Sequence, residues 1–381
     1  MTDNFTLPQV DIPVDMIHLG LGQPSNSLLP LNKLKKAASF SLSKKNPFFL
    51  AYGREQGNAN FRETLAHFLT GQYAYAVKPD QLLITNGNSQ ALDFICTHFT
   101  KPGDTVLVEE PSYFLALKIF ADQKLNIVGI PLDSQGIDTD QLQKQIELQT
   151  PAFVYTIPAH HNPASITLSY ERRNELVRIC AENNILLVAD EVYHCLSYTK
   201  EPPKSMGYWV DKCEMISLGS FSKILAPGLR LGWMQSNPAM IRKLTKSGLL
   251  QSGGGFNPFT SEIVNSVIHS GSLNTNLDKL KRTFKKRADV FINQITKNFP
   301  DQAVFKVPSG GYFVWIKLPD NIDTKLLRQT AQKNSVDFLP GSFFSSNNRL
   351  KNYMRLSFAF YEEELLKEGA KRLGELLCNH L

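Results

Sequence analysis

The sequence predicts an α/β protein with three layers, in which helices cover both faces of a mainly parallel sheet, and a smaller α+β domain built from both chain ends. Two observations carry this prediction. From about residue 80 short apolar runs alternate with helical patterns, and after residue 215 two apolar runs follow each other with no room for a helical crossover. Apolar strands separated by helices are typical of parallel sheets buried on both faces.

The alternation begins with an apolar run at 81–84, followed by residues 89–99, where Ala91, Ile95 and Phe99 recur at helical spacing. The same step repeats along the chain, with expected strands at 105–108, 153–157 and 185–189 and expected helices at 114–121 and 172–181. The apolar runs at 215–218 and 229–234 are joined by too short a connection for a parallel crossover. We therefore expect one antiparallel member in the sheet.

A second region begins near residue 260. It has helical periodicity at 260–287, strand patterns at 310–316 and 354–358, and an amphipathic helix at 362–377. The first 50 residues are rich in Pro and predict an arm plus part of this smaller domain. We expect three parts: residues 1–50 as the arm and part of the small domain, 51–265 as a large cofactor-binding domain, and 266–381 as a small C-terminal domain. A cleft between the halves follows from this arrangement.

The composition is that of an ordinary globular protein. Of 381 residues, 42% are hydrophobic and 20% charged, with a net charge of +6 from scattered basic residues. A nucleic-acid-binding protein would concentrate them on one face, so no nucleic-acid partner is expected. The five cysteines form no Cys-x-x-Cys pair, no 18 apolar residues run together, and Met1-Thr2-Asp3-Asn4 does not start a secretion signal. These features predict reduced thiols, a cytoplasmic location and no membrane span.

Polar residues follow the expected strands, at the edge where open parallel sheets bind ligands. Each residue alone has an ordinary structural explanation, such as a helix cap or a solvated side chain. Together they make a candidate site: Asn88, Ser89, Gln90, Tyr113, Asn162, Asp190, Tyr193, Ser220, Ser222 and Lys223.

The stretch from Gly219 to Trp233 indicates a specific chemistry, because it places two serines, Lys223 and Arg230 within a few residues. A lysine desolvated beside a cation has a depressed pKa, as an amine needs in order to attack a carbonyl. The hydroxyls and the guanidinium suit a phosphate group. A phosphate, a carbonyl and a lysine together indicate pyridoxal 5′-phosphate as the cofactor.

At these residues the chain resembles the class I/II aminotransferases, the fold type I pyridoxal-phosphate enzymes. Asn162-Pro163, Asp190 to Tyr193, Ser220 to Lys223 and Arg230 match the family in order and spacing. The resemblance runs from the Gly20-Leu21-Gly22-Gln23-Pro24 segment to the Met354–Phe358 segment. It implies a homodimeric transaminase acting on amino acids and 2-oxo acids in amino-acid metabolism.

The resemblance also implies residue roles. Lys223 is the cofactor lysine and proton carrier, and Asp190 pairs with the pyridine nitrogen, although a strand-end cap is its structural alternative. Asn162 and Tyr193 hydrogen-bond the ring's phenolic oxygen, and Tyr113 stacks on the ring. Arg355 holds the substrate carboxylate through a bidentate contact, and Gly22 lets the backbone come close to the same carboxylate.

Phosphate binding rests partly on the helix that Asn88, Ser89 and Gln90 are expected to open, because free amides and the helix dipole favour an anion there. The alternative is that Asn88 is an ordinary N-cap. By resemblance, Ser220, Ser222 and Arg230 complete this shell, and Tyr52 reaches it from the neighbouring subunit.

Two features depart from the family or lie outside it. Ser165 stands where the family's Asn-Pro-Thr-Gly motif has Gly, which puts the local turn in doubt more than the chemistry. The Gly253–Gly255 stretch is either a flexible hinge or part of the substrate pocket.

Other functions remain open. One alternative is a β-elimination lyase of the same fold, which shares imine formation and removal of the α-proton. A non-catalytic pyridoxal-phosphate sensor fused to a DNA-binding part is less favoured, because we expect no room for such a part before the arm. We expect no metal site, because the adjacent His160 and His161 cannot both face one metal ion. We expect no dinucleotide-binding motif, because Gly20-Leu21-Gly22 lacks the third glycine.

The similarity is closest to enzymes that act on aromatic, α-aminoadipate, kynurenine or branched-chain amino acids. The apolar candidates for the substrate pocket are Phe256, Phe259, Tyr312, Phe343 and Phe344, although ordinary core packing is the favoured explanation for each of them.

Overall fold

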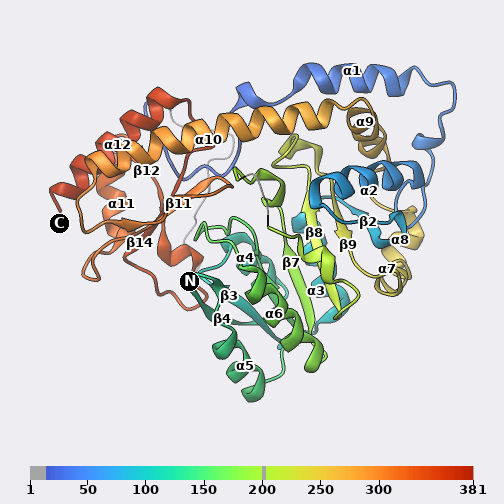
Figure 1. Ribbon diagram of the computed structural model, residues 1–381, viewed down its shortest axis with the longest axis horizontal. Coiled ribbons are helices and arrows are strands. Elements are labelled where there is room, and N and C mark those ends of the chain that lie inside the picture. The colour runs from blue at the N-terminus through green and yellow to red at the C-terminus, as the bar shows by residue number, and fades with distance from the viewer. Residues whose placement is uncertain (1–13, 200–202, 381) are drawn as a thin grey trace.

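The computed structural model describes residues 14–199 and 203–380, so the first 13 residues of the expected arm lie outside the described residues. Its centre is an eight-stranded sheet with the order β2-β9-β8-β7-β6-β3-β4-β5 (Figure 1). The strands are β2 (Leu82–Thr85), β3 (Thr105–Glu110), β4 (Asn126–Asp133), β5 (Gly136–Ile137), β6 (Phe153–Thr156), β7 (Leu186–Asp190), β8 (Met215–Ser220) and β9 (Gly232–Gln235).

The five strands from β8 to β4 are parallel, and the mainly parallel sheet that the sequence predicted is therefore confirmed. Strand β9 runs antiparallel to both β8 and β2, which confirms the expected antiparallel member. Strands β4 and β5 were not predicted, because β4 lies near the sheet edge with most of its side chains partly or fully exposed. Without a continuous apolar run, such a strand has little signal in the sequence.

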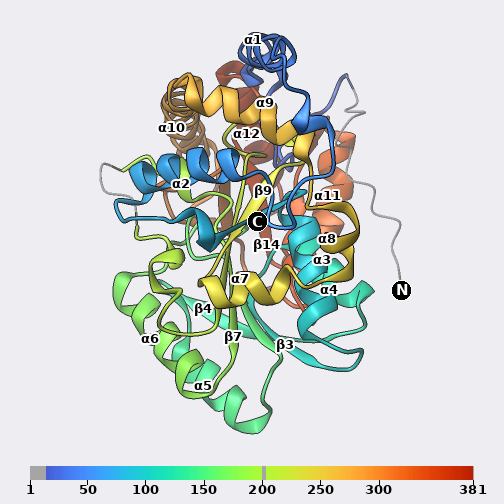
Figure 2. The ribbon, with the colours of Figure 1, turned by 90° about the vertical axis from the view of Figure 1, so that its right-hand side faces the viewer.

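Helices cover both faces of this sheet, as Figure 2 shows, with α5 and α6 on one side and α3 and α4 on the other. The β3 side chains alternate accordingly: Val106 and Val108 pack with α3 and α4, and Leu107 packs with α5 and α6. The covering helices are α3 (Asn88–Phe99), α4 (Phe114–Asp122), α5 (Thr139–Leu148), α6 (Tyr170–Glu182), α7 (Pro238–Leu244) and α8 (Gly248–Gly253).

A second, four-stranded sheet has the order β10-β11-β14-β13 and lies beside the first (Figure 1). Its strands are β10 (Val304–Phe305), β11 (Phe313–Lys317), β13 (Leu339–Pro340) and β14 (Tyr353–Ser357). A separate parallel pair joins the two ends of the chain, because β1 (Ile17–His18) pairs with β12 (Val336–Asp337). The domain boundaries themselves stay a prediction.

The remaining helices frame this half of the molecule. They are α1 (Leu31–Leu42), α2 (Ala59–Tyr73), α9 (Pro258–His269), α10 (Ser272–Asn298), α11 (Thr324–Lys333) and α12 (Glu363–Cys378). The helical pattern expected at 260–287 belongs to two helices rather than one, because the helical conformation is interrupted between α9 and α10 at Gly271, whose φ is +71°. Helix α10 continues to Asn298 and packs along α12.

The structure also bears on membrane spans and on the cysteines. No helix within the described residues is long and apolar enough to cross a membrane. All five cysteines are free thiols, and Cys96, Cys180 and Cys195 are buried.

Candidate active site

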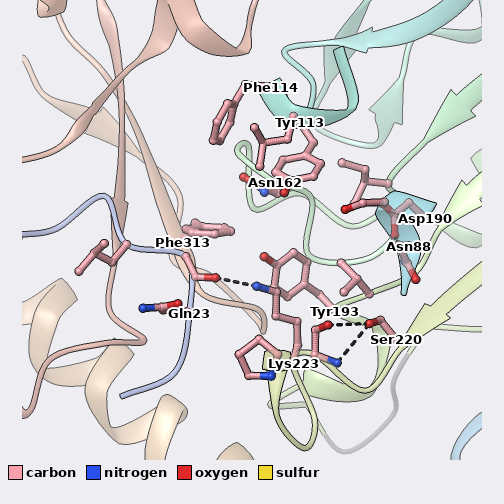
Figure 3. Close-up of a pocket in the computed structure, with 18 of the residues that line it drawn as sticks. Gln23, Asn88, Tyr113, Phe114, Asn162, Asp190, Tyr193, Ser220, Lys223 and Phe313 are labelled. Atoms are coloured by element: carbon pink, nitrogen blue, oxygen red, sulfur yellow. Dashed lines mark hydrogen bonds between the residues drawn. The ribbon is translucent and has the colours of Figure 1, made fainter. Parts of the chain in front are cut away.

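A cavity of about 490 Å³ lies at the carboxyl ends of the parallel strands, between the large sheet, the N-terminal segment and β11. Figure 3 shows the labelled side chains converging on it from these three parts of the fold. Most of the residues predicted from the sequence line this cavity together: Gly22, Asn88, Ser89, Tyr113, Asn162, Asp190, Tyr193, Ser220, Ser222, Lys223, Arg230 and Arg355. Gln90 and Tyr52 do not.

Asp190 ends β7 and is buried, with both carboxylate oxygens engaged. The Asn88 side-chain amide donates to Oδ1 at 2.6 Å, and the Tyr155 hydroxyl donates to Oδ2 at 3.0 Å. Burial raises the pKa of Asp190, and these two hydrogen bonds oppose the rise. Tyr155 was missed from the sequence. The available signal was a single phenol in the fully buried strand β6, next to the strand that ends in Asp190.

Lys223 lies across the cavity from Asp190, and its Nζ donates a hydrogen bond to the Gly22 carbonyl oxygen at 2.6 Å (Figure 3). Burial, together with the positive charges of Arg355 and Arg230, lowers the pKa of Lys223 to about 8. The Lys223 backbone carbonyl accepts a hydrogen bond from the Tyr312 hydroxyl at 3.1 Å. A lysine in this state holds or releases a proton near neutral pH.

Helix α3 points its N-terminus at one end of the cavity. Its N-cap is Gly87, which makes no side-chain cap, so the alternative that Asn88 is the N-cap is wrong. A Cβ on Gly87 would lie 3.1 Å from Nη2 of Arg230, and glycine therefore allows the guanidinium to approach this helix end. Gln90 is not among the residues that line the cavity, and its Oε1 accepts a hydrogen bond from the Asn86 amide.

The hydroxyls of Ser220 and Ser222 lie beside this helix end and hydrogen-bond each other at 3.0 Å. Arg230 adds a cation, and its Nη2 reaches the Asn86 carbonyl at 3.4 Å. Two hydroxyls, a guanidinium and a helix N-terminus form a typical anion-binding site.

Arg355, on β14, is buried at the other end of the cavity and is held from two sides. Its Nη1 donates to Oδ1 of Asn162 at 2.8 Å, and its Nη2 donates to the Gly20 carbonyl at 2.7 Å. A Cβ on Gly22 would lie 3.2 Å from the Phe313 ring and 3.8 Å from Nη2 of Arg355. Glycine at position 22 therefore leaves room for a carboxylate beside the guanidinium.

None of the five aromatic pocket candidates lines the cavity. The wall includes Leu21, Phe114, Leu115, Val192 and Phe313, which the sequence analysis did not single out. They were missed because an apolar residue in a strand or helix has the same pattern whether it faces a core or a cavity.

The Gly253–Gly255 stretch also lies outside the cavity lining, so its proposed part in the pocket is not supported. It packs against the Gly53-Arg54 segment, and a Cβ on Gly254 would lie 2.2 Å from the Gly53 carbonyl oxygen. The same segment carries Tyr52, whose side chain is 88% exposed. Tyr52 therefore does not line the cavity of its own chain.

Pyridoxal phosphate fits the chemistry of these groups. The anion site suits its phosphate, the Tyr113 side chain in the wall suits its flat ring, and the buried Asp190 carboxylate suits a protonated ring nitrogen. Oδ1 of Asn88 and Nε of Arg355 are buried without a hydrogen-bond partner, as expected of polar atoms beside a ligand site. Among the described residues, no three His, Cys, Asp or Glu side chains gather as metal ligands would.

Comparison with known proteins agrees with this geometry. The family described as "Aminotransferase class I and II" matches residues 14–373. The chain is 34% identical over 368 residues to aromatic-amino-acid aminotransferase 1 of Thermococcus litoralis, a match that covers 95% of this chain and 88% of that protein. It is 29% identical over 363 residues to the 2-aminoadipate transaminase of Thermus thermophilus, with 93% and 88% covered.

A solved structure of similar sequence has the same fold. The kynurenine aminotransferase of Pyrococcus horikoshii, solved with PMP, KYN as substrate and KYA as product, superposes with a TM-score of 0.90 at 33% identity. The match covers 96% of this chain and 92% of that chain. PMP is the amine form of pyridoxal phosphate.

Proposed function

This chain belongs to the class I and II aminotransferases and is a pyridoxal-phosphate-dependent enzyme, and from that premise we propose that its amino donor is an aromatic or similarly apolar α-amino acid. Its partner substrate in this proposal is a 2-oxo acid. The observation that carries the substrate proposal is the composition of the cavity lining.

The lining residues contain three cations, and each already has a proposed task. Arg230 lies at the anion site, Lys223 lies opposite Asp190, and Arg355 lies at the carboxylate end. No further Lys, Arg or His is among the lining residues to pair with a side-chain carboxylate. Because burying an unpaired carboxylate is costly, a donor with an apolar side chain suits this cavity better than α-aminoadipate.

The cofactor shell follows from the same positions. Ser220, Ser222, Arg230 and the α3 N-terminus would hold the phosphate, and Tyr113 would lie against the ring. Asp190 would keep the ring nitrogen protonated, because its buried negative charge favours a positive partner. When bound, the cofactor supplies an electron sink for the α-carbon of the amino acid.

The chain's own residues would then move and hold the reacting groups. The Nζ of Lys223, with its pKa near 8, suits removal of the α-proton and its return. Arg355 would bind the α-carboxylate of both substrates, because its pKa of about 10 keeps it charged at neutral pH. Asn162 and Tyr193 would hydrogen-bond the ring oxygen.

A donor panel tests the substrate proposal. The holoenzyme is given phenylalanine, tyrosine, kynurenine, leucine or 2-aminoadipate, each with 2-oxoglutarate or pyruvate as acceptor. We expect kcat/KM for the aromatic donors to exceed that for 2-aminoadipate by about tenfold or more, the usual effect of burying an unpaired polar group. A preference for 2-aminoadipate would reject the apolar class in favour of the dicarboxylic one.

We also propose a homodimer. The exposed side chains of Phe48, Leu50 and Tyr52 are apolar or aromatic, at 79%, 63% and 88% exposure. They adjoin α8 and α9, where Leu249 and Phe259 are also exposed, because Gly53 contacts Gly254 and the Phe49 ring lies 6.3 Å from that of Phe259. An exposed apolar group of this kind suits a second copy of the chain.

A further inference from the structure

Ser165 adopts a backbone conformation that favours glycine. Its φ is +57°, in the left-handed region, where a Cβ is disfavoured. It is also the position at which this chain departs from the family's motif. Because this conformation is unfavourable for serine, the contacts of the Ser165 hydroxyl are of interest.

The hydroxyl of Ser165 reaches another part of the fold. It donates a hydrogen bond of 2.6 Å to the backbone carbonyl of Phe313, the first residue of β11. The two residues are 148 positions apart in the sequence. Glycine cannot make this bond.

Phe313 in turn supports the residue proposed to bind the substrate carboxylate. Its ring centroid lies 4.0 Å from the Arg355 guanidinium carbon, a cation–π contact. Both residues are buried, and their strands are neighbours in the small sheet. Figure 3 shows the Phe313 ring facing the cavity beside the N-terminal segment.

The turn that carries Ser165 also holds Arg355 directly. Asn162, three residues earlier, accepts the hydrogen bond from Nη1 of Arg355. The turn is closed by backbone bonds, from the Ser165 amide to the His161 carbonyl at 2.7 Å and from the His161 amide to the Ile166 carbonyl at 2.8 Å. One turn therefore fixes the guanidinium twice, through the Asn162 side chain and through the bond from Ser165 to Phe313.

His161 anchors this turn to the large sheet. Its Nδ1 accepts a hydrogen bond from the Ala164 amide at 3.1 Å, and its Nε2 lies 3.0 Å from the carboxylate of Glu109, the second-last residue of β3. Both side chains are almost completely buried. Ser165 thus connects β11 to a rigid support rather than to a loose loop.

We propose that Ser165 is a positioning residue, which holds β11 and Phe313 so that Arg355 is pre-ordered for the carboxylate of both substrates. The inference rests on the proposed role of Arg355. A carboxylate is bound alike before and during the reaction, so the loss of this order should weaken binding and leave the chemical step unchanged.

The test compares S165A with S165G in the holoenzyme. Both variants lose the hydroxyl, but only glycine relieves the left-handed φ, so the melting temperature of S165G should exceed that of S165A. We expect both to raise KM for amino donor and oxo acid by about three- to tenfold, the effect of one lost hydrogen bond, with kcat unchanged. The matched control is K124G, because Lys124 is exposed and also has a positive φ of 60°; it should change stability alone.

A second readout needs no turnover. Propionate and 3-phenylpropionate, which have a carboxylate and no amino group, are titrated into the holoenzyme and followed by the absorbance of the bound cofactor. Both variants should bind both acids more weakly by the same factor. Wild-type affinity in S165G, or KM values that follow the melting temperatures, would overturn the positioning role, as would a wild-type protein that binds neither acid. Equal affinity of the wild-type protein for the two acids would instead contradict the proposed apolar donor, and this outcome is distinct from failure of the positioning role.

Discussion

Asn88 and Asp190 are joined by a 2.6 Å hydrogen bond, from the side-chain amide of Asn88, at the start of α3, to the carboxylate of Asp190, at the end of β7. This bond links the helix end proposed to hold the phosphate to the carboxylate proposed to face the ring nitrogen. Because Tyr155 occupies the other oxygen, the carboxylate has a fixed orientation in the cavity. A fixed, buried charge can stabilise a developing charge without reorganising first.

Replacing Asp190 by Asn should leave cofactor binding measurable and reduce transamination by about 100-fold or more, because a neutral amide cannot keep the ring nitrogen protonated. Stopped-flow absorbance of the first half-reaction measures the loss. Tyr155→Phe is the matched control, since it removes one hydrogen bond to the same carboxylate and keeps its charge; we expect a smaller effect. Unchanged turnover in Asp190→Asn would support the strand-end cap instead.

Lys223 should be the most reactive lysine of the cofactor-free protein near neutral pH. Its pKa of about 8 lies below the ordinary value of 10.5, so the neutral amine is already abundant at pH 8, whereas ordinary lysines remain protonated. Labelling with an amine-selective reagent from pH 6 to 10, followed by peptide mapping, should show Lys223 labelling rising around pH 8. Lys118, whose side chain is exposed, serves as the internal comparison.

The same lysine has a test in the loaded enzyme. Lys223→Ala should retain the fold and lose turnover, and borohydride reduction of the wild-type holoenzyme should place the label on Lys223. A label on any other lysine would show that the cofactor lysine has been wrongly assigned.

The sequence predicted the charged chemistry of this site better than its apolar walls. Asp190 and Lys223 follow buried strands, where a polar residue stands out, and Arg355 was reached through the family resemblance. Phe313 and Phe114 were missed because their positions depend on how the two sheets pack. The bond from Ser165 to Phe313 was equally out of reach, since it joins residues 148 positions apart. In the fold, β4 was missed for its weak apolar pattern, and the break at Gly271 was not distinguished from a continuous helix.

Replacing Arg355 by Lys or Gln should weaken amino donor and oxo acid together, because one guanidinium is proposed to bind both carboxylates. The loss of a charged hydrogen bond corresponds to about 1.5–3 kcal/mol, or roughly ten- to hundredfold in each affinity. Steady-state KM values for both substrates measure it, and circular dichroism checks the fold, since Arg355 also bonds Asn162 and Gly20. Weakening of one substrate alone would contradict a shared carboxylate site.

Tyr52 should act in the partner subunit's site. A heterodimer of a Tyr52→Phe chain and a Lys223→Ala chain would then have one site with both defects and one intact site. Its activity should be about half that of the wild-type dimer and well above that of the Tyr52→Phe homodimer. If Tyr52 acted within its own chain, the heterodimer would not exceed half the activity of the Tyr52→Phe homodimer. Tyr170→Phe, at a 50% exposed tyrosine that does not line the cavity, is the control.

The last prediction separates transamination from lyase chemistry and concerns stoichiometry. In a transaminase the amino group stays on the enzyme until an oxo acid removes it, so an amino acid added alone should convert the cofactor once and then stop. The absorbance of the aldehyde form should disappear in proportion to the number of sites, and one equivalent of oxo acid should be released without free ammonia. Adding a 2-oxo acid should restore the original spectrum, because Arg355 is proposed to bind its carboxylate at the same place. A β-elimination lyase would instead continue to release product and ammonia without an acceptor, and a non-catalytic sensor would release no oxo acid at all.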